Sequence, residues 1–265
     1  MRLSHSGDDG ALKRFRNAGM FKTKWGIVAE AAIITLPLLG VKALFHLLDW
    51  ELISVGPIIT ALVAGVFFVL AILLSGVLQD FKESEKMSGE VAACIEALYK
   101  DSRLTGKAEE SAAMLSHLRD ILHAMVFNFE RGGVWELGEI NPIVDRIDDS
   151  IRSFAEKGVP APLLVKMRNE LGNLKKISNR VYVIKETSFA PSAYAIAELA
   201  TGAALLVLLL SKTGTYYEGL LLVGVLSLVL ISVILLIKDM DNPFEGHSTV
   251  DMSHLHKLEE YLDNR

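Results

Sequence analysis

Residues 52–86 read LISVGPIITALVAGVFFVLAILLSGVLQDFKESEK, an apolar run that passes directly into a charged one. As a helix the apolar part, Leu52–Leu78, measures roughly 40 Å, which is more than the ~30 Å hydrocarbon core of a bilayer. The charged part, Gln79–Lys86, consists mainly of residues that favour helix as well. This stretch therefore predicts a helix that crosses a membrane and continues into water.

Three further apolar runs, of roughly 20 residues each, are long enough to cross a membrane. They are Gly26–Leu48, Ser192–Ser211 and Glu218–Ile237. Together with Leu52–Leu78 they form one pair near each end of the chain, and a charged segment separates the two pairs. The fold class that this pattern predicts is all-α, with a four-helix transmembrane domain and a helical cytoplasmic domain inserted between spans two and three.

The distribution of basic residues predicts how the spans are oriented. The first run is preceded by the basic residues Arg2, Lys13, Arg14, Arg16, Lys22 and Lys24. The turn after that run, 49–51, contains no basic residue, and the turn between runs three and four, 211–219, contains only Lys212. Because Lys and Arg gather on the cytoplasmic side, we expect both termini in the cytoplasm. The chain would then be a multi-pass protein of the cell inner membrane or an organellar equivalent.

The expected organisation has five parts. The N-terminal segment 1–25 and the C-terminal tail 239–265 are cytoplasmic, residues 26–78 hold transmembrane helices 1 and 2, and residues 192–238 hold helices 3 and 4. Residues 79–191 form the cytoplasmic helical domain. We expect each boundary where the hydropathy of the chain changes.

Apolar series indicate how the helical domain packs. One series occupies a single face of a helix expected over 108–131, and its members are Met114, Leu118, Ile121, Leu122 and Met125. A second series repeats at alternating steps of three and four residues from Leu164 to Ile184. This seam could bind a helix of the same chain or of a neighbouring subunit. Between the two series, Asn141-Pro142 predicts the start of a helix, with Asn as its N-cap.

Several classes of function have no support in the sequence. The phosphate-binding loops GxxxxGK[ST] and GxGxxG and the hydrolase motifs HExxH and GxSxG are absent. Cys94 is the only cysteine, so an internal disulfide and a CxxC site are impossible. The net charge of −5 gives no basic nucleic-acid footprint. We therefore expect no enzyme activity, no catalytic residue, no cofactor, no metal site and no nucleic-acid partner.

Lys42 is the charge within the first run that most needs an explanation. An ionised group in mid-bilayer costs about 2.5–3.5 kcal/mol on insertion scales, so such a residue usually faces protein, water or the interface. Lys42 follows Pro37 and Gly40 near the end of its run, and its long side chain could reach the headgroups. Alternatively, it could attract anions at the mouth of a pore.

The second run contains the candidates for a pore lining. Ile58, Leu62 and Val66 stand at i, i+4 and i+8, so they lie on one side of a helix. A ring of such side chains from several subunits would form a narrow apolar collar that gates by dewetting. An ordinary contact with another helix or with lipid explains the same spacing, and both interpretations stay open.

The segment after the fourth run, 238–246, reads KDMDNPFEG. By itself Asn242-Pro243 ends a helix, because a residue before proline avoids the helical region. Together with four spans and a helical insert, the motif of Asn242, Pro243, Phe244 and Gly246 resembles the bestrophin superfamily. More narrowly, the chain is similar to the uncharacterised bestrophin-like membrane proteins of bacteria and plants.

This resemblance implies a homo-oligomer, a pentamer, that conducts an anion such as chloride across a lipid bilayer. The second helix of each subunit would line the pore, with the constriction at Ile58, Leu62 and Val66. Animal members also carry a dense acidic run after Pro-Phe-Gly that holds calcium, whereas here only Glu245 and Asp251 remain of it, with Asp239 and Asp241 upstream. Because a calcium site takes about six to eight oxygen ligands, the resemblance does not extend to calcium gating.

Two other functions fit the same pattern of spans. A membrane-anchored scaffold or sensor would use the helical domain to bind partners and would not conduct. A stator-type proton-channel subunit would also have two spans, a large insert and two more spans, and it would need a partner chain. A channel differs from both in requiring several copies of this chain around the second span.

Overall fold

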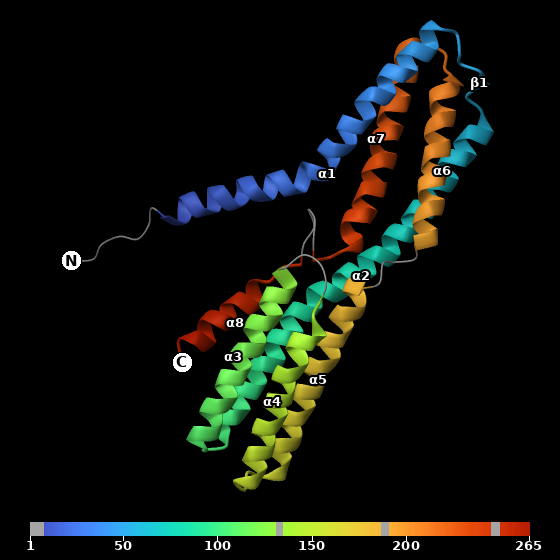
Figure 1. Cartoon of the computed structure of the whole chain (residues 1–265). Coiled ribbons are helices and arrows are strands. Elements are labelled where there is room, and N and C mark those ends of the chain that lie inside the picture. Colours follow the sequence, from blue (N-terminus) through green and yellow to red (C-terminus); the bar gives the residue numbers. More distant parts are fainter. Residues whose placement is uncertain (1–7, 131–134, 187–190, 245–249) are drawn as a thin grey trace. The chain divides into compact units, whose positions relative to one another are not determined.

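The computed structural model describes residues 8–130, 135–186, 191–244 and 250–265, with side chains from residue 25 onward. Figure 1 shows the elements in chain order. The helices of this part of the chain are α1 (Asp8–Leu47), α2 (Pro57–Leu104), α3 (Ala108–Glu130), α4 (Leu137–Glu156), α5 (Ala161–Glu186), α6 (Pro191–Leu210), α7 (Tyr216–Asp241) and α8 (Ser253–Asp263). Two short strands, β1 (Ile53–Ser54) and β2 (Ser211–Lys212), pair in parallel. The all-α fold class is confirmed.

The chain divides into two compact units. The membrane unit comprises residues 1–78 and 189–241, and the helical unit comprises residues 79–188 and 242–265. Among the described residues of the membrane unit, four helices are long and apolar enough to cross a membrane: part of α1 (Trp25–Leu47), α2, α6 and α7. Helix α1 packs along α7, and α6 contacts both of them. This composition makes the chain a membrane protein.

Helix α2 begins later than the apolar run and extends well beyond it. Residues 52–56 form β1 and a turn, and the helix starts at Pro57, where a missing amide costs nothing. The carbonyl of Gly56 accepts the amides of Ile59 at 3.1 Å and Thr60 at 3.2 Å, which closes the first turn. From there α2 continues unbroken to Leu104, so it supplies residues to both units.

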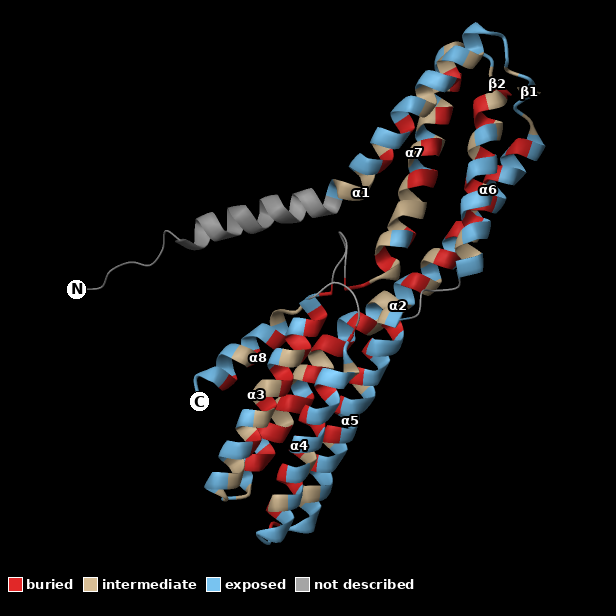
Figure 2. Cartoon of the chain, in the orientation of Figure 1, coloured by how far each residue is buried: buried red, intermediate tan, exposed pale blue. Residues whose placement is uncertain are grey.

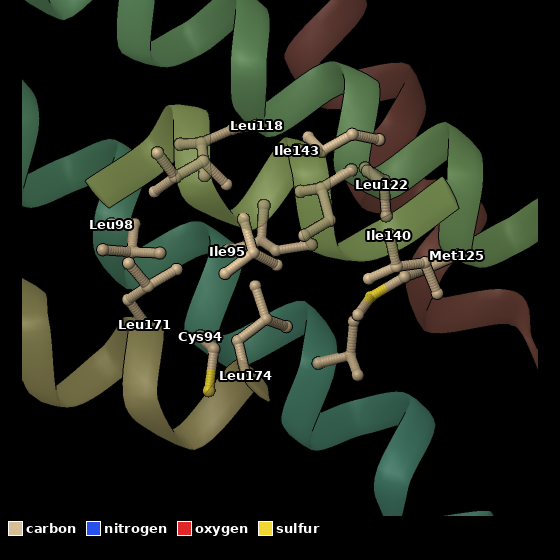
Figure 3. Packing of buried hydrophobic residues seen from close by; sticks show 14 of the residues in the cluster. Cys94, Ile95, Leu98, Leu118, Leu122, Met125, Ile140, Ile143, Leu171 and Leu174 are labelled. Atoms are coloured by element: carbon tan, nitrogen blue, oxygen red, sulfur yellow. The ribbon is translucent and has the colours of Figure 1, made fainter. Parts of the chain in front are cut away.

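The core of the helical unit lies between α3, α4, α5 and the second half of α2. Figure 3 shows Ile95 and Leu98 of α2 facing Leu118 and Leu122 of α3, together with side chains from α4 and α5. In Figure 2, buried positions recur at helical spacing along α3, α4 and α5. All five apolar residues predicted to share a face of α3 are buried. The seam of α5 packs on α4, so it is an intramolecular contact.

Helix α4 starts five residues before the predicted start. Asn141-Pro142 does not begin this helix, because α4 begins at Leu137 and Pro142 lies inside it. The chain before α4 is held in place from two sides: the indole of buried Trp135 donates to Ser178 Oγ at 3.3 Å, and the amide of Glu136 donates to Asn128 Oδ1 at 3.1 Å. These tertiary contacts fix the start of α4 at Leu137, although Asn141-Pro142 locally favours a start at Pro142.

The end of the chain belongs to the helical unit. Helix α8 packs on α3 through Leu255, Leu258 and Leu262, all buried. Arg119 of α3 donates from Nε to the carbonyl of Leu262 at 3.1 Å, which satisfies a carbonyl at the end of α8. The tail that the sequence shows as a separate part therefore contributes to the core of the helical unit.

Candidate pore helix and the polar cluster beside it

The membrane part of α2 has two distinct faces. The face turned toward its own subunit consists of residues at alternating steps of four and three: Ile59, Val63, Val66, Leu70, Leu73 and Val77. This is the 3.5-residue repeat of a helix that packs along a partner. The opposite face is exposed in the single chain, and its large apolar members include Phe68 and Ile72.

The three predicted collar residues divide between these faces. The side chain of Ile58 is 86% exposed and that of Leu62 is 38% exposed, whereas Val66 is only 4% exposed. Steps of four residues drift around a helix of 3.6 residues per turn, so the third member of the series has rotated into the buried face. Ile58 and Leu62 are therefore exposed in the single chain, and Val66 packs inside it.

Beyond Leu62, the exposed face includes Gly65, which has no side chain, before it reaches Phe68. Gly65 is exposed, and a methyl group at its Cα would meet no atom of the subunit within 4 Å. Residues 57–79 also contain no ionisable side chain. This face of α2 is therefore uncharged along the whole length that a bilayer would cover.

Lys42 is buried in a polar cluster beside the two strands. We call Lys42, His46, Glu51 and the carbonyls of Leu209 and Ser211 the turn cluster. The ammonium of Lys42, which is 2% exposed, lies 2.7 Å from Glu51 Oε1 and donates to the carbonyl of Leu209 at 3.2 Å and to that of Ser211. These partners use all three of its hydrogen-bond donors. Two of them are carbonyls at the end of α6, where a cation is favourable.

Glu51 links the other members of the turn cluster. Its side chain is 8% exposed, and its second oxygen lies 3.2 Å from His46 Nδ1. Burial raises the pKa of this carboxyl, but hydrogen bonds from Lys42 and His46 outweigh burial and hold the pKa below its ordinary value. The Glu51 carboxylate is therefore ionised at neutral pH, and it compensates the charge of Lys42.

The turn cluster joins segments that are far apart in sequence. It connects α1, the α1–α2 turn and the α6–α7 turn, next to the pairing of Ile53 with Ser211. Gly219 of α7 lies beside it: a methyl group there would be 3.7 Å from Lys42 Cε and would collide with Thr213 Oγ1. The charge of Lys42 is thus compensated by Glu51 within the same chain.

Sequence reasoning missed the role of Glu51. The useful signal was the need of Lys42 for a counter-ion, since a buried ammonium without a partner is costly. Asp49 and Glu51 were both close enough in sequence to supply that partner. Hydropathy alone does not distinguish between them, because the turn geometry decides which carboxylate faces Lys42.

The predicted motif after the last span lies in the helical unit. Asn242 Oδ1 accepts the amide of Phe244 at 3.3 Å, and the carbonyl of Pro243 accepts the amide of Val250 at 3.0 Å. The buried ring of Phe244 lies 5.5 Å from the ring of Phe129 and 5.2 Å from the ammonium of Lys185. Gly246 falls outside the described residues. Asn242, Pro243 and Phe244 thus fold the chain back onto its own core.

A metal centre is not among the candidate sites. Within the described ranges, no group of three or more His, Cys, Asp or Glu side chains is arranged to hold an ion. His256 lies 2.7 Å from Glu130 and 3.5 Å from Glu259, so it helps to hold α8 on α3.

Comparisons with known proteins agree on one family. A family model described as Bestrophin-like domain matches residues 46–255. Crystal structures of a bacterial bestrophin homologue from Klebsiella pneumoniae, each with one substitution, are similar in fold. One is 15% identical with a TM-score of 0.74, covering 89% of this chain and 97% of that chain. A second is 14% identical with a TM-score of 0.74, covering 89% and 96%.

A crystal structure described only as a membrane protein, also with one substitution, has a TM-score of 0.78 at 13% identity. The match covers 89% of this chain and 97% of that one. No curated protein sequence matches the chain. At these identities the structural likeness shows a shared fold.

Proposed function

This chain belongs to the Bestrophin-like family, and from that premise we propose that it assembles with copies of itself into an ion channel whose pore is lined by α2. The proposal includes a pentamer, conduction of an anion such as chloride, and both termini in the cytoplasm. It assigns the chain a role in transport and none in catalysis.

The observation that carries this proposal is the asymmetry of α2. One face packs into its own subunit, while the other is exposed, apolar and free of charge from Pro57 to Gln79. The same helix continues to Leu104 without a break, so α2 contributes residues to both units. A lipid-facing helix needs no such extension.

The proposed collar consists of Ile58 and Leu62, with Val66 behind them. The exposed side chains of Ile58 and Leu62 would face a symmetry axis and form the narrow apolar ring. Val66, buried in its own subunit, would hold α2 in place behind that ring. The turn cluster would fix the end of α2 at which the collar lies, because β1 precedes this end by two residues.

The absence of acidic side chains from the exposed face of α2 is compatible with anion conduction. Rings of Asp or Glu select cations and rings of Lys or Arg select anions, and residues 57–79 contain neither, so no fixed negative charge on this face opposes an anion. Lys42 does not add a free positive charge, because Glu51 compensates it. Selectivity in this proposal therefore comes from an apolar passage without fixed negative charge.

The test is to record currents from the purified full-length chain in a planar bilayer. We expect Leu62→Ala to widen the collar and raise the conductance. Val66→Ala is the matched control, because it removes methyl groups from the same helix on the buried side; it should lower thermal stability and leave the single-channel conductance unchanged. Equal conductance in the wild type and Leu62→Ala would show that this face of α2 does not line the pore.

Subunit number separates the channel from the alternatives. Particle images of the purified protein should show a ring of copies with α2 nearest the axis. A monomer or dimer without current would instead support a membrane-anchored scaffold. Co-purification with a single-span partner chain would support a stator-type subunit.

A further inference from the structure

A pocket of about 460 Å³ lies in the helical unit, where α2 ends and α3 begins. Its lining includes Tyr99 and Arg103 of α2, Lys107 of the connecting turn, Ser111 of α3 and Arg265. Three of these side chains are cationic, and they come from three separate segments of the chain. The volume lies within the usual range for small-molecule sites.

A pair of tyrosines positions the two guanidinium groups. The rings of Tyr99 and Tyr261 meet edge to face, with centroids 6.1 Å apart. Arg103 lies 5.9 Å above the ring of Tyr99 and Nη1 donates to its hydroxyl at 3.4 Å, and Arg265 lies 5.1 Å above the ring of Tyr261. Stacking on aromatic rings restricts guanidinium motion while leaving the N–H groups free to bind.

The three cations lack acidic partners in the described part of the chain. Neither Arg103, Lys107 nor Arg265 forms a salt bridge there within 4.0 Å. The first turn of α3 contains Glu109 and Glu110. Glu110 accepts its own backbone amide and lies 3.2 Å from Lys157, and Lys107 interacts with it more weakly, through charge alone. Among the described residues, the three cations of the pocket are therefore not held in ion pairs.

Lys107 argues most directly for an anionic ligand. Arg103 lies in the last turn of α2, where a cation complements the helix dipole and needs no further explanation. Lys107 stands immediately before the first residue of α3, where the dipole is positive and a cation is unfavourable. An anion in the pocket would satisfy Lys107 together with the first free amides of α3.

We propose that this pocket binds a phosphate group. Guanidinium forks suit the oxygens of a phosphate, a lysine adds a point charge, and a helix N-terminus adds amide donors. The phosphate could belong to a small soluble compound or to a lipid headgroup. The proposal does not depend on conduction, because every residue that it uses lies in the helical unit.

The test uses the purified full-length chain with pyrophosphate as the soluble probe, measured by calorimetry in detergent. We expect saturable binding of one pyrophosphate per subunit, weakened about tenfold or more in Lys107→Ala, which loses one charge-assisted contact. Lys100→Ala is the matched control. It also removes one positive charge, here from α2, but Lys100 is paired with Glu96 at 2.6 Å and does not line the pocket.

A second arm of the test identifies the source of the phosphate. Phosphatidylcholine vesicles with and without phosphatidic acid are tested for co-flotation with the same three proteins. Binding to either probe that is lost in Lys107→Ala and kept in Lys100→Ala supports the site, and the probe that binds identifies the source. Absence of binding to both probes, or equal loss in both variants, would overturn the proposal.

Discussion

At the scale of single residues, Lys42 shows how this chain carries a charge within an apolar run. Its ammonium is paired with Glu51 and donates to carbonyls at the end of α6, so the charge of Lys42 does not face hydrocarbon. The cluster ties one turn of the membrane unit to the other, and both partners are almost completely buried. Breaking such a pair from one side leaves an uncompensated charge in a buried place.

We therefore predict that Glu51→Gln destabilises the membrane unit by about 3 kcal/mol, the usual order for removing one partner of a buried ion pair. The measurement is thermal unfolding of the protein in detergent, followed by circular dichroism. Glu96→Gln is the control, because its exposed pair with Lys100 should contribute little. Equal melting temperatures for wild type and Glu51→Gln would show that the pair has no net effect.

The pKa of Glu51 also predicts a dependence of stability on pH. The folded state holds this pKa below its ordinary value of 4.5, so the unfolded state binds the proton more readily as pH falls. The contribution of Glu51 is therefore complete above pH 4.5 and is lost as pH falls through the folded pKa. When melting temperatures are measured below pH 4.5, the melting temperature of the wild type should therefore fall more steeply with decreasing pH than that of Glu51→Gln.

Sequence patterns predicted the elements better than the contacts between them. Four spans and a helical insert follow from hydropathy, because a helix is the simple way to satisfy a backbone in lipid. The partner of Lys42 and the start of α4 do not follow, since each depends on residues that turns or tertiary contacts bring together. Among the proposed collar residues, spacing alone could not show that Val66 faces inward.

At the scale of elements, α8 shows a short helix whose place depends on packing. An isolated helix of 11 residues is marginal in water. Its stability must come from three buried leucines against α3 and from Arg119 at its end. Asp251 lies two residues before the first residue of α8, where its carboxylate accepts the amide of Ser253 at 2.9 Å, a bond that lowers the pKa of Asp251.

We predict that Leu255→Ala releases α8 from α3. Leu255 is fully buried, and truncating such a side chain to alanine costs about 2–5 kcal/mol of packing free energy. A helix as short as α8 is only marginally stable by itself, so it cannot offset that loss. Hydrogen exchange should then quicken throughout α8 while the amides of α4 stay protected. Leu104→Ala is the control, because Leu104 is 74% exposed; if both variants exchange alike, the leucine contact does not hold α8.

At the scale of the whole molecule, the membrane unit exposes apolar side chains on more than one helix. In a single chain, exposure does not distinguish a side chain that faces a pore from one that faces lipid. Ile72 of α2 is 58% exposed and Leu199 of α6 is 75% exposed. Both lie near the middle of their apolar segments. In the proposed assembly they face different solvents: Ile72 would face a water-filled pathway, and Leu199 would face lipid.

This difference predicts the reactivity of introduced cysteines. In a Cys94→Ser background, Ile72→Cys should react with a charged, membrane-impermeant thiol reagent and the reaction should reduce the current, because thiolate forms in water. Leu199→Cys, at a similar depth, should stay unmodified, because neither the reagent nor a thiolate is stable in hydrocarbon. The native Cys94 is buried and should contribute little background. The reverse pattern, with position 199 modified and position 72 protected, would place α2 at the lipid and exclude it as the pore helix.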